Sequence, residues 1–228
     1  IIENFPDKRV QVFLEEIPDA FEYLNRKEAL EGNTEKFDLF VSLDCGSLDR
    51  LGEAEPVFHA AVRRVNIDHH ISNTNFADVN HVEAEASSTC EVLCGLLDME
   101  RIDYFSAQAF YTGIIHDTGV FKHSNTGLST MEIAGKLMQK GIPYGKIIDE
   151  SFYMKTYRQL QIMGRCLLES VRVMDGKVIF SVVSRRVMDF YEAKPSDLDG
   201  VIDEMRTTQG VEVAILLTEK DTIEYKVS

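Results

Sequence analysis

Short apolar runs alternate with helical patterns in the first 70 residues, and this alternation most narrows the folds open to the chain. The runs 9–16 (RVQVFLEE), 37–46 (FDLFVSLDCG) and 60–70 (AAVRRVNIDHH) have the composition of strands. Residues 19–30, between the first two runs, are expected to form a helix or a loop. Such alternation predicts a parallel sheet with helices on its faces, an α/β fold. Functional groups of these sheets gather beyond the carboxyl ends of the strands.

Serines mark three predicted helix starts after these strands. Ser88 and Ser129 each precede a glutamate by three residues, which is the spacing of a capping box. Ser106 predicts a third start, before a helix that runs into Asp117. We therefore expect a group of helices between the parallel sheet and the second half of the chain.

The pattern changes in the second half. Pro143 opens a helical stretch, rich in polar and aromatic residues, that predicts a linker. Asp175–Gly176 lies between two β-type runs and predicts a hairpin, and residues 211–228 predict a second one. We expect three parts: a parallel-sheet domain over 1–145, a linker helix over 146–170 and a smaller α+β domain over 171–228.

Residue types that bind metals end three of the predicted elements. Asp44 ends the second strand, Asp68, His69 and His70 end the third, and Asp117 ends a helix. Carboxylates and imidazoles suit manganese, iron or zinc. Two metals about 3.5–4 Å apart can activate a bridging water for phosphoryl displacement. On spacing alone the signals stay weak, because an aspartate at a strand end is more often a turn or cap residue.

Charge and cysteine content restrict the partners. The 24 basic and 38 acidic residues give a net charge of −14, with no Lys/Arg cluster, which argues against stable binding of duplex nucleic acid. The four cysteines lack the spacing of a zinc site and are expected to be free thiols. Free thiols, apolar runs too short to span a bilayer and no secretion signal predict a cytoplasmic protein without membrane contact.

Three motifs, in order, resemble the DHH phosphoesterase superfamily: DCG (44–46), IDHH (67–70) and HDTGVFKHSNT (116–126). Residues 85–93 (EASSTCEVL) also resemble this family, and residues 200–219 resemble its DHHA1 portion. The chain looks most similar to the DHH–DHHA1 branch. That branch holds the bifunctional oligoribonuclease and 3′-phosphoadenosine 5′-phosphate phosphatase (nano-RNase) proteins and, more distantly, RecJ exonuclease. The resemblance implies a DHH domain with helices on both sheet faces, a helical linker and a DHHA1-like domain.

The resemblance also implies metal ligands. Asp44 would bridge two manganese ions, and His69 and Asp117 would complete the second metal site. Mg²⁺ or Co²⁺ could replace Mn²⁺. The family's first motif would precede residue 1, and its GGGH motif would follow residue 228, so both ends are expected to be truncated.

Three further residues receive roles from the resemblance. His70 would act on the scissile phosphate, as both a catalytic and a substrate-binding residue, and Asp68 would orient a histidine through its ring N–H. Asn125 could contact substrate or cap a turn.

The expected function is that of a manganese-dependent hydrolase that cleaves short oligonucleotides (nanoRNA), 3′-phosphoadenosine 5′-phosphate, or both, by a two-metal activated water. Alternatives are a phosphodiesterase of cyclic or linear dinucleotides and a nucleotide-binding module without catalysis. Inorganic pyrophosphate or polyphosphate is a further alternative, against which the DHHA1-like region argues. The expected partners are short RNA or DNA oligonucleotides or nucleotide phosphates, and the family resemblance allows a homodimer.

Overall fold

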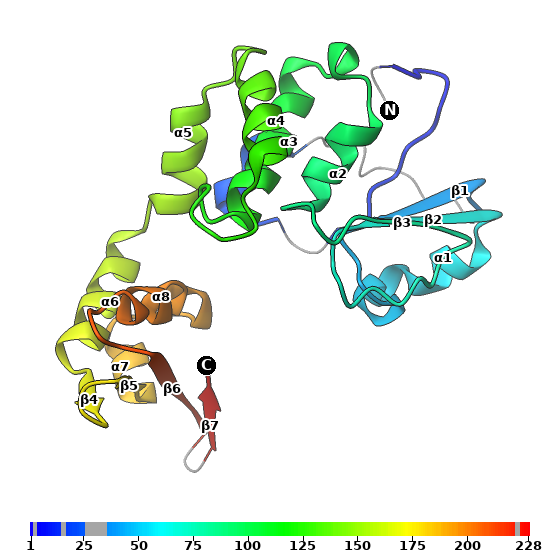
Figure 1. The fold of residues 1–228 in the computed structure, drawn as a ribbon. Helices are drawn as coiled ribbons and strands as arrows, with labels where there is room; N and C mark the ends of the chain where they lie inside the picture. Colours follow the sequence, from blue (N-terminus) through cyan, green and yellow to red (C-terminus); the bar gives the residue numbers. More distant parts are fainter. Residues whose placement is uncertain (2–3, 15–16, 26–35, 222–223) are drawn as a thin grey trace. The chain divides into compact units, whose positions relative to one another are not determined.

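Two compact units make up the chain, Ile1–Tyr153 and Met154–Ser228 (Figure 1). The computed structural model describes residues 1, 4–14, 17–25, 36–221 and 224–228. Each unit has its own buried apolar residues, so each is described by itself. No helix within the described ranges is long and apolar enough to cross a bilayer.

The first unit contains the predicted parallel sheet. Its strands β1 (Leu39–Leu43), β2 (Arg63–Asp68) and β3 (Val79–Val82) lie in the order β1-β2-β3, and both neighbouring pairs are parallel. Helix α1 (Glu55–Ala60) packs on one face, where its Phe58 meets Phe40 of β1, and α2 (Thr89–Leu96) contacts β2 (Figure 1). This confirms the α/β architecture and brings the carboxyl ends of β1 and β2 side by side.

The N-terminal segment differs from the prediction. Residues 9–14 form no strand, and residues 15–16 of the predicted strand lie outside the described residues. The ring of Phe13 instead stacks on Phe40, with 6.0 Å between centroids, and meets Phe37 edge-on at 5.9 Å. The apolar side chain of this segment thus packs against the sheet domain without a strand pairing. Of the segment expected to be a helix or a loop, the structure describes a short 3₁₀ helix, η1 (Asp19–Leu24).

Three helices follow α2 in the first unit: α3 (Tyr104–Asp117), α4 (Leu128–Met138) and α5 (Tyr144–Ile148). Ile114 and Ile115 of α3 and Leu137 of α4 are fully buried in their shared core. This packing fixes the end of α3, where Asp117 lies.

The helix starts are only partly as predicted. Ser88 caps α2, since its hydroxyl accepts the backbone N–H of Glu91. Asp103 caps α3 in place of the predicted Ser106, whose backbone N–H it accepts at 2.7 Å. Helix α4 begins after Gly127, with no cap from Ser129. Helix α3 starts earlier than expected because Asp103 satisfies the amide of Ser106, whereas α4 starts at Leu128 without a side-chain cap.

The helical stretch after Pro143 is interrupted. Helix α5 passes into a π-helical turn, η5 (Asp149–Tyr153), and residues 154–156 are not helical. Thr156 then caps α6 (Tyr157–Leu168) in a capping box with Gln159. Because the unit division follows Tyr153, the two halves of the predicted linker belong to different units.

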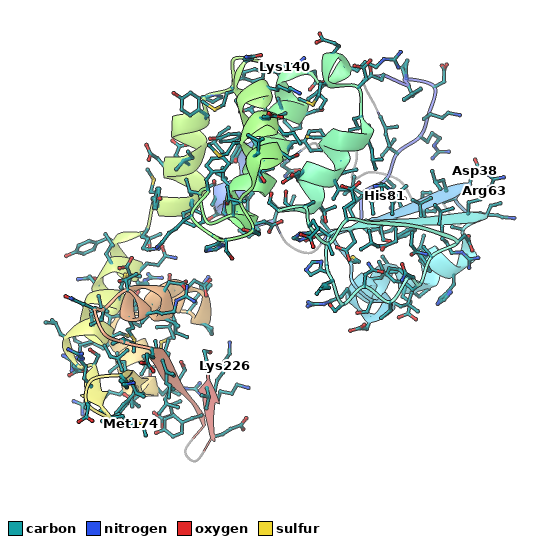
Figure 2. All side chains as sticks on the ribbon, in the orientation of Figure 1. Asp38, Arg63, His81, Lys140, Met174 and Lys226 are labelled. Carbon is teal, nitrogen blue, oxygen red and sulfur yellow. The ribbon has the colours of Figure 1, made fainter. Side chains whose placement is uncertain are left out.

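The second unit is a small α+β arrangement. Its sheet has the order β4 (Val171–Val173), β5 (Val178–Val183), β6 (Val213–Asp221) and β7 (Glu224–Val227). Both predicted hairpins are present as antiparallel pairs, β4 with β5 and β6 with β7, and the central pair is parallel. Figure 2 shows Met174 at the first hairpin turn, where Met174, Asp175 and Gly176 all have positive φ.

Helices bury one face of this second sheet. They are α6, α7 (Arg185–Phe190) and α8 (Val201–Arg206), with the 3₁₀ helix η6 (Pro195–Leu198) before α8. Ile162, Val201 and Met205 are fully buried at their contact with β5 and β6. The second unit therefore has a core of its own.

Candidate metal centre

The carboxyl ends of β1 and β2 deliver the predicted ligands to one place. Asp44 follows β1, and its backbone N–H bonds to the carbonyl of Ile67 in β2 at 3.1 Å. Its φ of +61° is a left-handed conformation, which turns the chain sharply after the strand. Ligand atoms of Asp44, His69 and His70 all lie within 4.8 Å of one another.

Asp117 joins this group from the end of α3. The Nε2 atom of His69 lies 3.6 Å from Oδ1 of Asp44 and 3.8 Å from Oδ2 of Asp117. Asp44 and Asp117 therefore face the same imidazole nitrogen from two different elements. The structure brings together all three residues that were predicted to hold metal.

The other nitrogen of His69 sets the orientation of its ring. Nδ1 lies 3.2 Å from the carbonyl oxygen of Ala86. A carbonyl can only accept, so Nδ1 carries a proton, and Nε2 is the ring nitrogen that faces the two carboxylates. A histidine held in this way through its second nitrogen is typical of metal ligands.

Asp68 lies behind the ligands and is fully buried. It accepts hydrogen bonds from Nδ1 of His70 at 2.7 Å, from Nδ2 of Asn73 at 2.6 Å and from the backbone N–H of His69 at 2.8 Å. Burial alone would raise the pKa of Asp68, but these hydrogen bonds outweigh it and lower the pKa. The same hydrogen bond from Asp68 raises the pKa of His70. Asp68 is thus an anion that orients His70 and leaves its Nε2 for another partner.

No lysine or arginine in the described part of the chain pairs with the carboxylates of the site. Neither Asp44 nor Asp117 forms an ion pair there with a lysine or arginine. Burial, and then the charge of Asp44, raise the pKa of Asp117. Two carboxylates and an imidazole with excess negative charge are a donor set that fits a divalent cation.

The loop after Asp117 has unusual backbone geometry. Gly119, Val120 and Phe121 all have positive φ, between 55° and 64°. A Cβ on Gly119 would lie 2.5 Å from Nε2 of His123, so a side chain at this position would collide with that ring. The hydroxyl of Thr118 accepts the backbone N–H of Phe121 at 3.0 Å and stabilises the turn.

Asn125 lies in this loop and holds it in place. Its Nδ2 donates to the carbonyl oxygens of Ser87 at 3.0 Å and Asp117 at 3.2 Å. These bonds fix the backbone beside a candidate ligand. The substrate contact of Asn125 stays a prediction.

No role was predicted from the sequence for three polar residues that lie near the site. Thr89 donates its hydroxyl to Oδ1 of Asp44 at 2.7 Å. Asn66 is fully buried and donates to the carbonyl of Cys45 at 3.1 Å, and Asn73 donates to the same carbonyl at 3.2 Å. Asn66 offered one signal, because it is a polar residue inside an apolar strand pattern.

Comparison with known proteins agrees with this geometry. The DHH family, N-terminal domain, matches residues 4–114. The "Bifunctional oligoribonuclease and PAP phosphatase NrnA" of Bacillus subtilis is 19% identical over 96% of this chain and 70% of its own length. The protein of the same name from Thermus thermophilus is 25% identical over 69% of this chain and 47% of its own length.

A solved structure supports the fold. The crystal structure of an exopolyphosphatase-related protein from Bacteroides fragilis superposes with a TM-score of 0.81 at 22% identity, covering 92% of this chain and 66% of that one. The matched residues 4–114 include Asp44 and the triplet Asp68–His69–His70, which the structure places at the ends of adjacent parallel strands. Residues 4–114 of the chain therefore form a DHH-family domain, and relatives named as oligoribonucleases and PAP phosphatases match nearly the whole chain.

Proposed function

We propose that the chain is a manganese-dependent phosphoesterase that hydrolyses short oligoribonucleotides, 3′-phosphoadenosine 5′-phosphate, or both. The observation that carries the proposal is the convergence of Asp44 and Asp117 on Nε2 of His69, at 3.6 and 3.8 Å. The names of the Bacillus and Thermus relatives, which combine oligoribonuclease and PAP phosphatase activities, support the substrate class.

Asp44, His69 and Asp117 would hold the metal, with Asp44 shared between two ions. When bound, divalent ions supply Lewis-acid polarisation of a phosphoryl oxygen and lower the pKa of a coordinated water. The hydrogen bonds from Nδ1 of His69 to Ala86 and from Thr89 to Asp44 keep these side chains in place. Little reorganisation of the protein is then needed when an ion enters.

His70 would act on the phosphate itself. Its Nδ1 is occupied by the buried Asp68, so Nε2 is the ring nitrogen that can donate to a phosphate oxygen. The raised pKa of His70 favours the imidazolium, in which both nitrogens are donors. A donor aimed at an oxygen that gains negative charge stabilises the transition state.

The C-terminal part is proposed to bind the nucleotide end of the substrate. We assign residues 1–145 to the DHH domain, 146–170 to the linker and 171–228 to a DHHA1-like region. Support comes from the resemblance of residues 200–219, which form α8 and most of β6. A short substrate also suits a chain with a net charge of −14 better than a long duplex does.

A direct assay tests the activity. The protein is incubated with Mn²⁺ and a 5′-phosphorylated RNA dinucleotide, and mononucleotide release is followed with and without EDTA. A parallel reaction with 3′-phosphoadenosine 5′-phosphate follows phosphate release. We expect release on at least one substrate that stops with EDTA. Release that is insensitive to EDTA, or no release on either substrate, would contradict the proposal.

A further inference from the structure

One turn of the chain, residues 86–89, contacts two of the candidate ligands directly. The carbonyl of Ala86 accepts from Nδ1 of His69 at 3.2 Å. Three residues later, the hydroxyl of Thr89 donates to Oδ1 of Asp44 at 2.7 Å. This turn therefore sets which nitrogen of His69 faces the site and where one oxygen of Asp44 lies.

The same turn reaches the third ligand through Asn125. The carbonyl of Ser87 accepts from Nδ2 of Asn125 at 3.0 Å, and the same Nδ2 donates to the carbonyl of Asp117 at 3.2 Å. A displacement of Ser87 would move Asn125 and so the backbone that carries the Asp117 carboxylate. All three candidate ligands thus depend on the position of residues 86–89.

A buried carboxylate holds this turn. Glu91 is 7% exposed, and its Oε2 accepts from the backbone N–H of Ser87 at 3.1 Å and from the Ser87 hydroxyl at 2.5 Å. The same oxygen accepts from the hydroxyl of Thr130 in α4 at 2.8 Å. Burial alone would raise the pKa of Glu91, but these hydrogen bonds outweigh it and lower the pKa, so the side chain is ionised.

We propose that Glu91 is a positioning residue of the metal centre. By holding Ser87 against α4, it fixes the turn 86–89 and thereby the directions in which Asp44, His69 and Asp117 present their ligand atoms. This inference rests on the proposed function, because it takes those three residues as metal ligands. Glu91 itself makes no contact with them among the hydrogen bonds of the described residues.

The substitution Glu91→Gln keeps the shape of the side chain and removes its charge. A carboxylate oxygen accepts several hydrogen bonds strongly, whereas a neutral amide accepts them more weakly and can turn its NH₂ toward the same donors. Loss of partners behind metal ligands typically weakens metal affinity about 10- to 100-fold. We expect an effect of that size on Mn²⁺ binding by this variant.

Calorimetric titration of the metal-free protein with Mn²⁺ alone tests the inference without any assay of activity. Circular dichroism first establishes that each variant is folded at the titration temperature. The matched control is Glu85→Gln, which removes the same charge from an exposed residue in the same segment and should bind Mn²⁺ as wild type does. A folded Glu91→Gln variant of wild-type affinity would overturn the inference, even if its thermal stability were lower.

A second pair of variants decides the matter if Glu91→Gln does not fold. Thr130→Val removes one hydrogen bond to Glu91 and should weaken Mn²⁺ affinity. Thr130→Ser keeps the hydroxyl and should bind Mn²⁺ as wild type does. Equal affinities in this pair would overturn the inference. Absence of Mn²⁺ binding by the wild-type protein is a separate outcome, which would remove the metal centre proposed above and this inference with it.

Discussion

Substitution of His69 is the most direct test of the proposed metal site, because both carboxylates face its Nε2. His69→Ala removes that nitrogen, and Asp117→Ala removes one of the carboxylates. We expect each variant to lose Mn²⁺-dependent hydrolysis, by about 10²-fold or more, since outer partners alone account for about 10- to 100-fold. Initial rates of mononucleotide release measure the loss.

His59→Ala is the matched control for these variants. His59 lies in α1, exposed, 3.5 Å from the carboxylate of Glu55 one helical turn earlier. An exposed pair of this kind contributes little to stability. Its removal should leave the rate within about twofold of wild type. Near-normal rates for His69→Ala or Asp117→Ala would rule out the ligand assignment.

The Asp117 carboxylate is expected to favour metal binding but to lower the stability of the metal-free protein. Burial and the charge of Asp44 raise its pKa, so its ionised form is disfavoured in the folded protein. Above the unfolded-state pKa of about 3.8 this carboxylate therefore destabilises the metal-free fold, and the loss grows as pH rises through the folded pKa. Asp117→Asn removes the charge and should raise the melting temperature of the EDTA-treated protein at neutral pH.

The same substitution should abolish the stabilisation that Mn²⁺ gives. Melting curves of wild type and Asp117→Asn, with EDTA and with Mn²⁺, compare the two effects. If Asp117→Asn melted below wild type in EDTA, the Asp117 carboxylate would not be destabilised by burial and by the charge of Asp44, and the prediction would be wrong. Residues placed for ligand binding at a cost in stability are common in active sites.

At the scale of elements, the start of α3 tests which residue caps the helix. Asp103 accepts the backbone N–H of Ser106 at 2.7 Å, so Asp103 is the cap of α3. Asp103→Ala should lower the free energy of unfolding by about 0.5–2 kcal/mol, the usual cost of losing a cap. Ser106→Ala, inside the helix, should change it by only a few tenths of a kcal/mol. Urea denaturation measures both, and equal effects would contradict the assignment.

Elements with strong local patterns were predictable. The apolar runs that became β1 and β2 end in Asp44 and Asp68, and Asp175–Gly176 gave the turn of the first hairpin. Strand β3 was missed because its sequence, VNHV, carries polar Asn80 and His81 and has no apolar alternation. Its stability as a strand comes from pairing with β2, which is not visible in local sequence.

Some residues of the candidate site were likewise predictable from local sequence, and others were not. The ligand types at the ends of elements were found, because metal-binding residues are few and their place after a strand is a local property. The residues that hold them were not, because Thr89 lies 45 positions from Asp44 and Thr130 lies 39 from Glu91. Ser88–Glu91 was recognised only as a capping box, whereas the Glu91 carboxylate bonds to Ser87 and Thr130.

For the whole molecule, the separate cores predict that damage to one unit spares the other. Ile162 of α6 and Ile114 of α3 are both fully buried, but they belong to different cores. Truncation of either to alanine should destabilise its own unit by about 2–5 kcal/mol. All the proposed ligands lie in residues 1–153, and the Thr118 hydroxyl beside Asp117 donates to the carbonyl of Ile114 at 2.7 Å.

Ile162→Ala should therefore bind Mn²⁺ as wild type does, while Ile114→Ala should bind it more weakly. Hydrogen exchange assigns each loss of protection to its unit, and calorimetry measures the affinity for Mn²⁺. Local unfolding in one cooperative unit leaves the protection of another unchanged when they share no core. If Ile162→Ala weakened Mn²⁺ binding as much as Ile114→Ala, the two units would have to be treated as one cooperative structure, and the metal centre would depend on both.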